Sequence, residues 1–595
     1  MVSSETLEFI NNPLDVFQKV FQSKWNSGQG DLINWGFTEH FNTIFNTEEK
    51  VRQIPSLSHR LINQLSKNTL VRFRGMVQDT SLGQECFIDV LESTNKMNGE
   101  KVFHCLRFTD SELEEETEQF TRHFESPNNR VDEKQLYFCV SIPGETDWAK
   151  SQAETSHLSS ELEDQNVEEL REMTQSISIE GNTFEVPNGV RSRYPFPDED
   201  HLPVLVKVYG SEEGPKVGEV VEFIGIYTPP VSQSTTQANA ESSVNTHSVE
   251  VDSLPCLHTI VHRKIGPYSG IYSHEKSIPE SHIAELRQEM ETIRPKLIEY
   301  LASSLGGDQL AAEFLLLQLM SYVHTRKSGF CVGNLSLNIC NVPETLPSGV
   351  TFNGTPLKAF TSNLAKVLSS LLPKFYTLPL SLDLLNNNSF TPRSNEFLKS
   401  GMLQVSDGTT LLVDETALDE GNLNDSGVRN INELHSVLQT QELTYVFPYY
   451  EMKFPVNLGI TVLSNAKTFL PVDCVVPLQP TPITPSDIEE SLLDKFRLYL
   501  MIFQHIDYSI PEHVSQILQE DFVKRRQEAY AAGEELMSQG DMLFLLTLAR
   551  LVAQTFGETE LTEQIWKYTV ELNETRKQRV NGLPTRQVTN PTLNR

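Results

Sequence analysis

Apolar residues follow two different spacings along this 595-residue chain. Near the N-terminus, Phe17, Phe21 and Trp25 recur every four residues, which is typical of one face of a helix. Farther on, short runs of β-branched and aromatic residues are separated by Gly and Asn turns, which is typical of strands. The pattern predicts a helical region at residues 1–66 and a β domain at 67–228.

The second half of the chain alternates predicted helices with predicted strands. Helices are expected at 281–304, 308–324 and 357–372, and strands at 336–341, 378–384, 410–413 and 458–463. Strands that alternate with helices predict a mainly parallel, doubly wound sheet with helices on both faces. After Pro482 the apolar spacing is helical again, which predicts an appended helical domain.

Two charged stretches interrupt the β pattern, at about 109–134 and about 149–200. Such composition buries too little apolar surface to offset the conformational entropy lost on folding, so we expect an acidic flexible insertion at about 109–200. The strands on both sides of it are expected to form one barrel. The segment 229–260, which is rich in Ser, Thr and Asn, is typical of a linker.

The chain is strongly acidic, with 80 Asp and Glu against 48 Lys and Arg and a formal net charge of -32. Such a surface repels phosphate, which argues against nucleic acid as a ligand and favours a protein partner with a basic surface. The seven cysteines include no Cys-x-x-Cys pair, which argues against disulfides and a zinc site and suits a reducing compartment. Neither a secretory signal nor an apolar run of about 18 residues is visible, so no membrane association is expected.

The best chemical clue is the apolar run Thr410–Val413, which is followed by Asp414 and Glu415. In an active P-loop ATPase such a run is a buried strand, and the acidic pair holds a metal ion and orients the attacking water. The same pattern is common where carboxylates cap the next helix. The motif by itself leaves both interpretations open.

The phosphate-binding half of such an ATPase site is missing. The strand at 335–339 would have to lead into Gly-x-x-x-x-Gly-Lys-[Ser/Thr], whose backbone N–H groups wrap the phosphates. The nearest match is Gly349-x-x-x-x-Gly354, but Thr355 and Pro356 follow it. We therefore predict no hydrolysis, no catalytic residues, no cofactor and no bound metal.

Three further groups were weighed as sites. His104 beside Cys105 has no Asp or Asn partner in view, which favours core packing over a catalytic dyad. The basic cluster Lys524–Arg526 on a predicted helix is typical of a solvated face. The aromatic run at 445–454 favours a hairpin core over a stacking platform for bases.

Several segments of the second half resemble the AAA+ ATPase domain of the minichromosome maintenance (MCM) helicase subunits. They are Asp308–Leu319, Gly333–Asn338, Leu380–Asp383 with Asn395–Phe397 and Gly401–Leu403, Leu434–Gln441, and Gly459–Ser464 followed by Asn465. The resemblance implies that Asp414, Glu415 and Asn465 are remnants of the Walker B and sensor positions. Two other helicase features are absent: no arginine-finger segment follows Asn465, and Leu543 occupies the position of the sensor arginine.

The chain resembles still more closely the MCM-binding protein family, over nearly its whole length. The markers are Leu70–Val77, which also resembles the helicase OB barrel, and Leu411–Thr416, Phe454–Asn457 and Leu470–Cys474. The resemblance implies a nuclear, non-catalytic protein that binds and chaperones MCM subunits and subcomplexes. It also implies help in unloading the complex from chromatin in DNA replication, and support of sister chromatid cohesion.

With this resemblance, the predicted fold class is α/β plus β. The predicted order is an N-terminal helical region (1–66), an OB-like β domain (67–228), a linker (229–260), a degenerate AAA+-like domain (261–482), a helical lid (483–580) and a disordered tail (581–595).

Two alternative functions remain open. The first is a residual ATP-binding switch that acts through Asp414. The second is a single-stranded nucleic-acid binder that uses the OB-like barrel, with Arg72 and Arg74 as its basic contacts.

Overall fold

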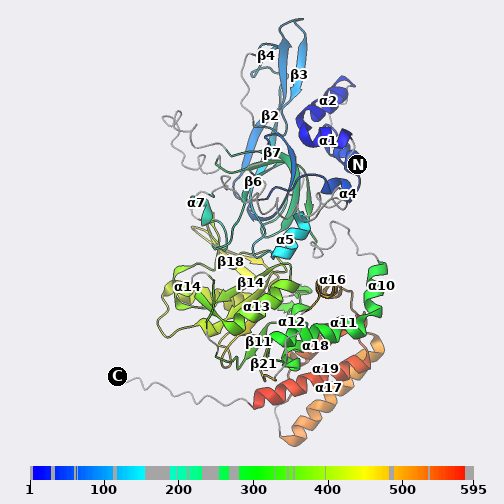
Figure 1. Ribbon diagram of the computed structural model, residues 1–595, viewed down its shortest axis with the longest axis vertical. Helices are drawn as coiled ribbons and strands as arrows, with labels where there is room; N and C mark the ends of the chain where they lie inside the picture. Colours follow the sequence, from blue (N-terminus) through cyan, green and yellow to red (C-terminus); the bar gives the residue numbers. More distant parts are fainter. Residues whose placement is uncertain are drawn as a thin grey trace. The chain divides into compact units, whose positions relative to one another are not determined.

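The structure is a computed structural model (Figure 1), and it divides into two compact units. The first consists of Met1–His274, Phe390–Asp407 and Tyr445–Met452, and the second of Glu275–Ser389, Gly408–Thr444 and Lys453–Arg595. The described residues are 4–27, 34–58, 62, 65–110, 117–154, 186, 188–196, 198–210, 214–230, 253–266, 280–327, 330–344, 347–352, 355–394, 397–481, 488–533 and 536–582. The predicted mixed α/β composition with a helical C-terminus is confirmed.

Five strands of the first unit close into a ring. The ring runs from β1 (Leu70–Asp79) through β7 (Val220–Thr228), β8 (Cys256–Lys264), β6 (Pro203–Tyr209) and β5 (Arg130–Val140) back to β1. The pairing of β6 with β8 is parallel and the other four are antiparallel. Outside the ring, β2 (Gln84–Asn95) pairs with β5, β3 (Lys101–Cys105) and β4 (Phe120–Arg122).

The N-terminal helices pack on this ring. They are α1 (Ser4–Asn11), α2 (Pro13–Asn26), α3 (Phe37–Ile44) and α4 (Glu48–Arg52). Their aromatic residues share one core cluster with residues of β1, β2, β7 and β8, including Leu70, Val90 and Ile224. The helices at 1–66 are therefore confirmed as helices, but they belong to the same compact unit as the strands.

Two predicted boundaries of the β domain are wrong. The strand β8 falls across the predicted linker and the start of the predicted AAA+-like domain, although it belongs to the ring. The described part of the predicted insertion at 109–200 contains β4, β5 and two helices, α5 (Asp147–Glu154) and α7 (Asn188–Arg191). In the first half of β5, charged residues predominate, and exposed residues alternate with half-buried ones. This half resembles a surface loop in sequence, so the strand was not predicted although its second half is buried. Residues 155–185 of the insertion and 231–252 of the linker lie outside the described residues.

Five parallel strands form the sheet of the second unit. Their order is β14 (Phe375–Pro379), β17 (Thr410–Asp414), β20 (Gly459–Leu463), β11 (Leu337–Cys340) and β21 (Cys474–Pro477). The parallel sheet is thus confirmed, but the strand predicted at 378–384 is displaced. Ser381 caps the short helix α14 (Leu382–Asn387), so the strand has to end before it.

Helices and short hairpins complete the second unit. The helices are α10 (Glu280–Gln288), α11 (Met290–Ser304), α12 (Gln309–Leu319), α13 (Ala359–Leu371) and α15 (Asp425–Thr440). The hairpins pair β9 (Thr325–Lys327) with β10 (Phe330–Val332), and β12 (Pro347–Phe352) with β13 (Thr355–Lys358).

Four helices form the C-terminal part, as predicted for residues after 482. They are α16 (Glu490–Gln504), α17 (Glu512–Ala532), α18 (Gln539–Thr555) and α19 (Glu563–Asn581). Arg579 of α19 donates to Asp308 at 2.6 Å, which links this part to the cap of α12. Residues 583–595 of the predicted tail lie outside the described residues. Within the described ranges, no helix combines the length and apolar character that spanning a membrane requires.

A small four-stranded sheet is formed by β16 (Leu398–Lys399), β15 (Arg393–Ser394), β18 (Glu442–Val446) and β19 (Glu451–Pro455). Two segments that contribute to it belong to the first unit, not to a continuous domain at 261–482 as predicted. Gln404 donates to the carbonyl of Gln78 at 3.1 Å, and the Arg193 guanidinium lies 5.2 Å from the Phe397 ring centre. These contacts join residues more than 200 positions apart, which no local pattern reveals.

Candidate site at the carboxyl edge of the parallel sheet

Asp414 is the last residue of β17, and its side chain is 1% exposed. Its Oδ2 accepts a hydrogen bond from the Thr361 hydroxyl at 2.8 Å. Its Oδ1 accepts from the backbone N–H of Thr416 at 2.9 Å and from the Thr416 hydroxyl at 2.6 Å. Asp414 thereby caps the 3-10 helix η1 (Glu415–Ala417), so the capping interpretation describes its present contacts.

The connection that precedes Thr361 differs from a phosphate-binding loop. After β11 ends at Cys340, the chain forms the β12–β13 hairpin before α13 begins at Ala359. Lys358, the N-cap of α13, makes no capping hydrogen bond through its side chain. Gly354 lies outside the described residues. The helix start is therefore reached from an antiparallel hairpin, where an ATPase has a compact glycine-rich turn.

Glu415 is half-buried beside Asp414 and accepts a short hydrogen bond from the Thr468 hydroxyl. The pKa of Glu415 is raised to about 7, mainly by burial and to a smaller extent by the charge of Asp414, while the hydrogen bond from Thr468 opposes the rise. Near neutral pH the Glu415 carboxyl group is therefore present in both the protonated and the ionised form.

Asn465 lies two residues beyond β20, which pairs with β17 so that Leu463 faces Asp414. Asn465 and Asp414 thus lie at the same edge of the sheet, because each is at or just beyond the end of one of two neighbouring parallel strands. The Asn465 side chain is exposed, however, and it is Thr468 that reaches Glu415. Thr361 and Thr468 were missed, because a threonine carries no signal until its distance to a carboxylate is known.

Leu543, at the position of the helicase sensor arginine, is not replaced in its role by the nearby Arg550 of the same helix. Leu543 on α18 is 47% exposed. Arg550, two turns farther along α18, is buried, donates to the carbonyl of Gly333 at 2.9 Å and lies 5.3 Å from the Tyr322 ring centre. Its guanidinium is thus occupied by the protein's own backbone and an aromatic ring.

Among the described residues, one group has the right ligand types at metal-binding distances: Asp110, Cys256 and His258 in the first unit. Lys207 lies 2.7 Å from Asp110, and Lys134 also binds this carboxylate. Burial lowers the pKa of His258 to about 3 and raises the pKa of Cys256 to about 12. A thiol and two ammonium groups do not suit a cation, so the group is an ion network in which two lysines pair with the exposed Asp110.

The structure also locates the weaker candidates. Burial raises the pKa of Cys105 to about 12 and lowers the pKa of His104, which opposes a thiolate–imidazolium dyad. Arg525 of the basic cluster pairs with Asp521 at 2.7 Å on α17. The aromatic run does not simply fill a hairpin core, because Tyr445 is buried but Tyr449 is 96% exposed.

Arg72 and Arg74 do not form the basic contact surface that the nucleic-acid alternative requires. Arg72 is 5% exposed and lies 3.6 Å from the buried Glu222. Arg74 pairs with Glu145 at 3.1 Å. A guanidinium that is buried in an ion pair with the protein's own carboxylate is not available to phosphate.

The N-terminal helix α2 also covers β3, which lies outside the ring. The side-chain amide of Gln18 on α2 donates to the carbonyl of Phe103 at 3.2 Å and accepts from the N–H of Cys105 at 3.0 Å. The Trp25 and Phe103 ring centres lie 4.6 Å apart. The aromatic face of β3 is therefore packed against the protein's own helix.

Comparison with known proteins gives consistent matches over this architecture. The family model described as "Mini-chromosome maintenance replisome factor" matches residues 41–180 and 158–580. A "Mini-chromosome maintenance complex-binding protein" of Arabidopsis thaliana is 31% identical over 96% of this chain and 98% of its own length. Proteins of the same name from Gallus gallus and Homo sapiens are 28% and 26% identical, again over 96% of this chain and 98% of theirs. The chain therefore belongs to the mini-chromosome maintenance replisome factor family.

Proposed function

We propose that this protein is a non-catalytic binding protein of the MCM complex. The single observation that carries the proposal is the match to relatives named as MCM complex-binding proteins over 96% of the chain. The net charge of -32 supports it, because an acidic surface steers association toward basic faces such as those of DNA-binding subunits.

The strand order supports an AAA+-like second unit. If the five parallel strands are numbered first to fifth in chain order (β11, β14, β17, β20, β21), their order across the sheet, read from the β21 edge, is fifth, first, fourth, third, second. This is the order of AAA+ ATPases, in which a helical lid follows the sheet as α16–α19 do here. The first unit has the features of an OB-like barrel, a closed five-stranded ring with its one parallel pair between the third and fifth ring strands in chain order.

The contacts of Asp414 support a pseudo-ATPase. Both carboxylate oxygens already accept hydrogen bonds from Thr361 and Thr416, so metal binding would have to displace bonds inside a buried site. A chain built like a helicase subunit, but without a grip on phosphate, occupies a subunit's position without completing an ATPase site. As the resemblance to the MCM-binding protein family implies, we propose a nuclear role as chaperone of MCM subunits, in unloading the complex from chromatin and in sister chromatid cohesion.

Affinity capture from nuclear extract, followed by crosslinking mass spectrometry, tests the proposal. MCM subunits should be the most enriched partners, and crosslinks should identify the contacted subunit and surface. Absence of MCM subunits from the captured material would contradict the proposal.

Calorimetry with Mg-ATP addresses the residual ATP-switch alternative. We expect no heat of binding from the purified chain. Heat that Asp414→Ala abolishes would favour the switch.

A further inference from the structure

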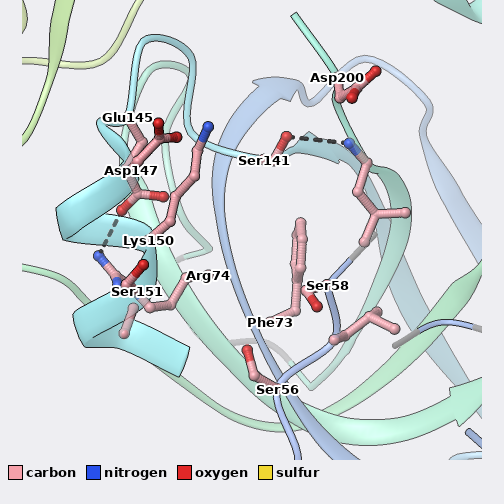
Figure 2. A pocket seen from close by; sticks show the side chains of 13 residues that line it. Ser56, Ser58, Phe73, Arg74, Ser141, Glu145, Asp147, Lys150, Ser151 and Asp200 are labelled. Atoms are coloured by element: carbon pink, nitrogen blue, oxygen red, sulfur yellow. Dashed lines mark hydrogen bonds and ion pairs between the residues drawn. The ribbon is translucent and has the colours of Figure 1, made fainter. Parts of the chain in front are cut away.

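The first unit contains a pocket of about 530 Å³ beside the ring. Figure 2 shows the Phe73 side chain between α5, which carries Asp147, Lys150 and Ser151, and the segment that carries Asp200. The apolar part of the lining is provided by Leu57, Phe73 and Leu202, each at most 4% exposed. The pocket thus has a buried apolar floor and a charged rim.

Arg72, which a nucleic-acid binder would have used on its surface, instead holds both walls of this pocket. Its Nε donates to the carbonyl of Ile54 at 3.1 Å, beside the wall Ser56–Ser58. Its Nη2 donates to the carbonyl of Ala153 at 3.1 Å, in the wall formed by α5. The salt bridge from Arg74 to Glu145 fastens the chain just before α5. The walls are therefore fixed to β1, and the pocket is a built feature of the fold.

The floor of the pocket is a gap in the pairing of β1. At one end Arg72 bonds through its backbone to Pro55 at 2.9 Å and to Leu57 at 2.7 Å. At the other end β1 pairs with β5, beginning at Met76 and Val140. We call this gap between the two pairings the seam.

Strand geometry shows which residue faces the seam. Backbone groups of successive strand residues point to opposite edges, and Val77 bonds to Glu219 on the β7 side. The even-numbered residues therefore face the other edge, where Arg72 and Met76 are paired. Arg74 lies between them, and among the described residues no backbone hydrogen bond joins it to Ser58 or Ser141. An N–H and a carbonyl at a strand edge are the groups that an added peptide strand uses.

The charged rim favours a basic ligand. Asp147 and Asp200 are exposed, and Figure 2 shows them on opposite sides of Phe73. Glu145 is already neutralised by Arg74, which leaves Lys150 against two carboxylates. A lysine or arginine side chain fits this arrangement, because its methylene groups can cover an apolar floor while its charged end reaches a carboxylate.

We propose that this pocket binds an extended peptide segment of an MCM subunit, with a lysine or arginine of that segment placed between Asp147 and Asp200. The segment's backbone bonds to Arg74 in the seam, and its basic side chain lies over Phe73 and Leu202. The inference rests on the proposed function and adds to it a surface and a chemical class of contact.

The test uses the full chain and purified MCM subunits. Asp147→Asn combined with Asp200→Asn should weaken binding of the captured subunit about tenfold and reduce its dependence on salt. The matched control is Asp419→Asn with Glu420→Gln, which removes two exposed charges from the second unit and should leave the affinity unchanged. Equal affinity of the wild type and the pocket variant would overturn the pocket while the proposed function stands. A wild type that binds no subunit would overturn the proposed function itself.

A photocrosslinking residue in place of Ser151 gives a second readout that does not depend on loss of binding. Ser151 lines the pocket from α5 and is exposed. We expect crosslinks to one MCM subunit, in a peptide that contains Lys or Arg. Crosslinks to a segment without basic residues, or to a second copy of this chain, would overturn the proposal.

Discussion

The sheet edge at Asp414 and the seam at Arg72 both contain a buried charged group, but the two groups differ in where their hydrogen-bond partners lie. Asp414 accepts its hydrogen bonds from hydroxyl and amide groups of the sheet edge itself, and this closes the site. Arg72 donates to backbone carbonyls of two separate walls, and this leaves space between them. Burial of a charged residue therefore does not by itself indicate a binding site. A binding site also requires that the hydrogen-bond partners of the charged residue leave space for a ligand between them.

The largest effect should come from removing the charge that organises the seam. Arg72→Met removes a buried guanidinium that lies 3.6 Å from the buried Glu222 and donates to the carbonyls of Ile54 and Ala153, so the free energy of unfolding should fall by about 3–5 kcal/mol. Urea unfolding followed by tryptophan fluorescence suits this test, because Trp25, Trp35 and Trp148 lie in the first unit. The control Arg74→Met breaks a more exposed pair and should cost about 1 kcal/mol. A loss below 1 kcal/mol for Arg72→Met would show that Glu222 is solvated.

The closed site should respond less strongly to the corresponding change. Asp414→Ala leaves two threonine hydroxyls and an amide without their acceptor and should destabilise the second unit by about 2–3 kcal/mol. Hydrogen exchange of the β17 amides measures this locally. Asp414→Asn keeps an acceptor and should cost less. If Asp414→Ala instead stabilises the protein, the carboxylate is held there for another purpose, such as metal binding.

The closed site at Asp414 should also make stability depend on pH, through the neighbouring Glu415. Its pKa of about 7 in the folded state exceeds the ordinary value of 4.5, so the folded protein binds this proton more tightly than the unfolded chain. Its contribution to stability is fully present below pH 4.5 and is lost as pH rises through 7, by roughly 1–2 kcal/mol after allowance for solvent relaxation. Glu415→Gln should remove this slope in unfolding measurements between pH 5 and 8. An unchanged slope would place the titration elsewhere.

The smallest expected effect is in nucleic-acid binding, where we expect none. Because Arg72, Arg74 and the face of β3 are engaged internally, single-stranded oligonucleotides should produce no gel shift even at low salt. A shift that weakens steeply with added salt would contradict this expectation and revive the nucleic-acid alternative.

The sequence predicted the parts of the fold that have a local period. The parallel strands at 410–414 and 459–463 and the C-terminal helices followed from apolar spacing, and Asp414 was correctly placed at a strand end. The strand β8 escaped prediction because its pairing with β6 and β7 is set by residues far from it in sequence. The strand β5 escaped because its exposed half carries the charges of a surface loop.

The candidate sites were less predictable than the fold. Thr361, which donates to Asp414, and Thr468, which donates to Glu415, each lie 53 residues away along the chain, and nothing in their spacing marks them. Arg72 and Arg74 were assigned to a surface because a strand pattern does not tell which residue of the pair meets a buried carboxylate. Such partners become visible only once distant segments are placed together.

The composition of the first unit also sets when it is completed during synthesis. Its last segment ends at Met452, although its main body ends at His274. At 5–20 residues per second, a ribosome needs on the order of 10–40 seconds to make the chain between those two points. During that interval the strands β11 and β14 are made before Gln404, the residue that donates to the carbonyl of Gln78. The unit that begins at the N-terminus is thus complete only after much of the second unit has been made.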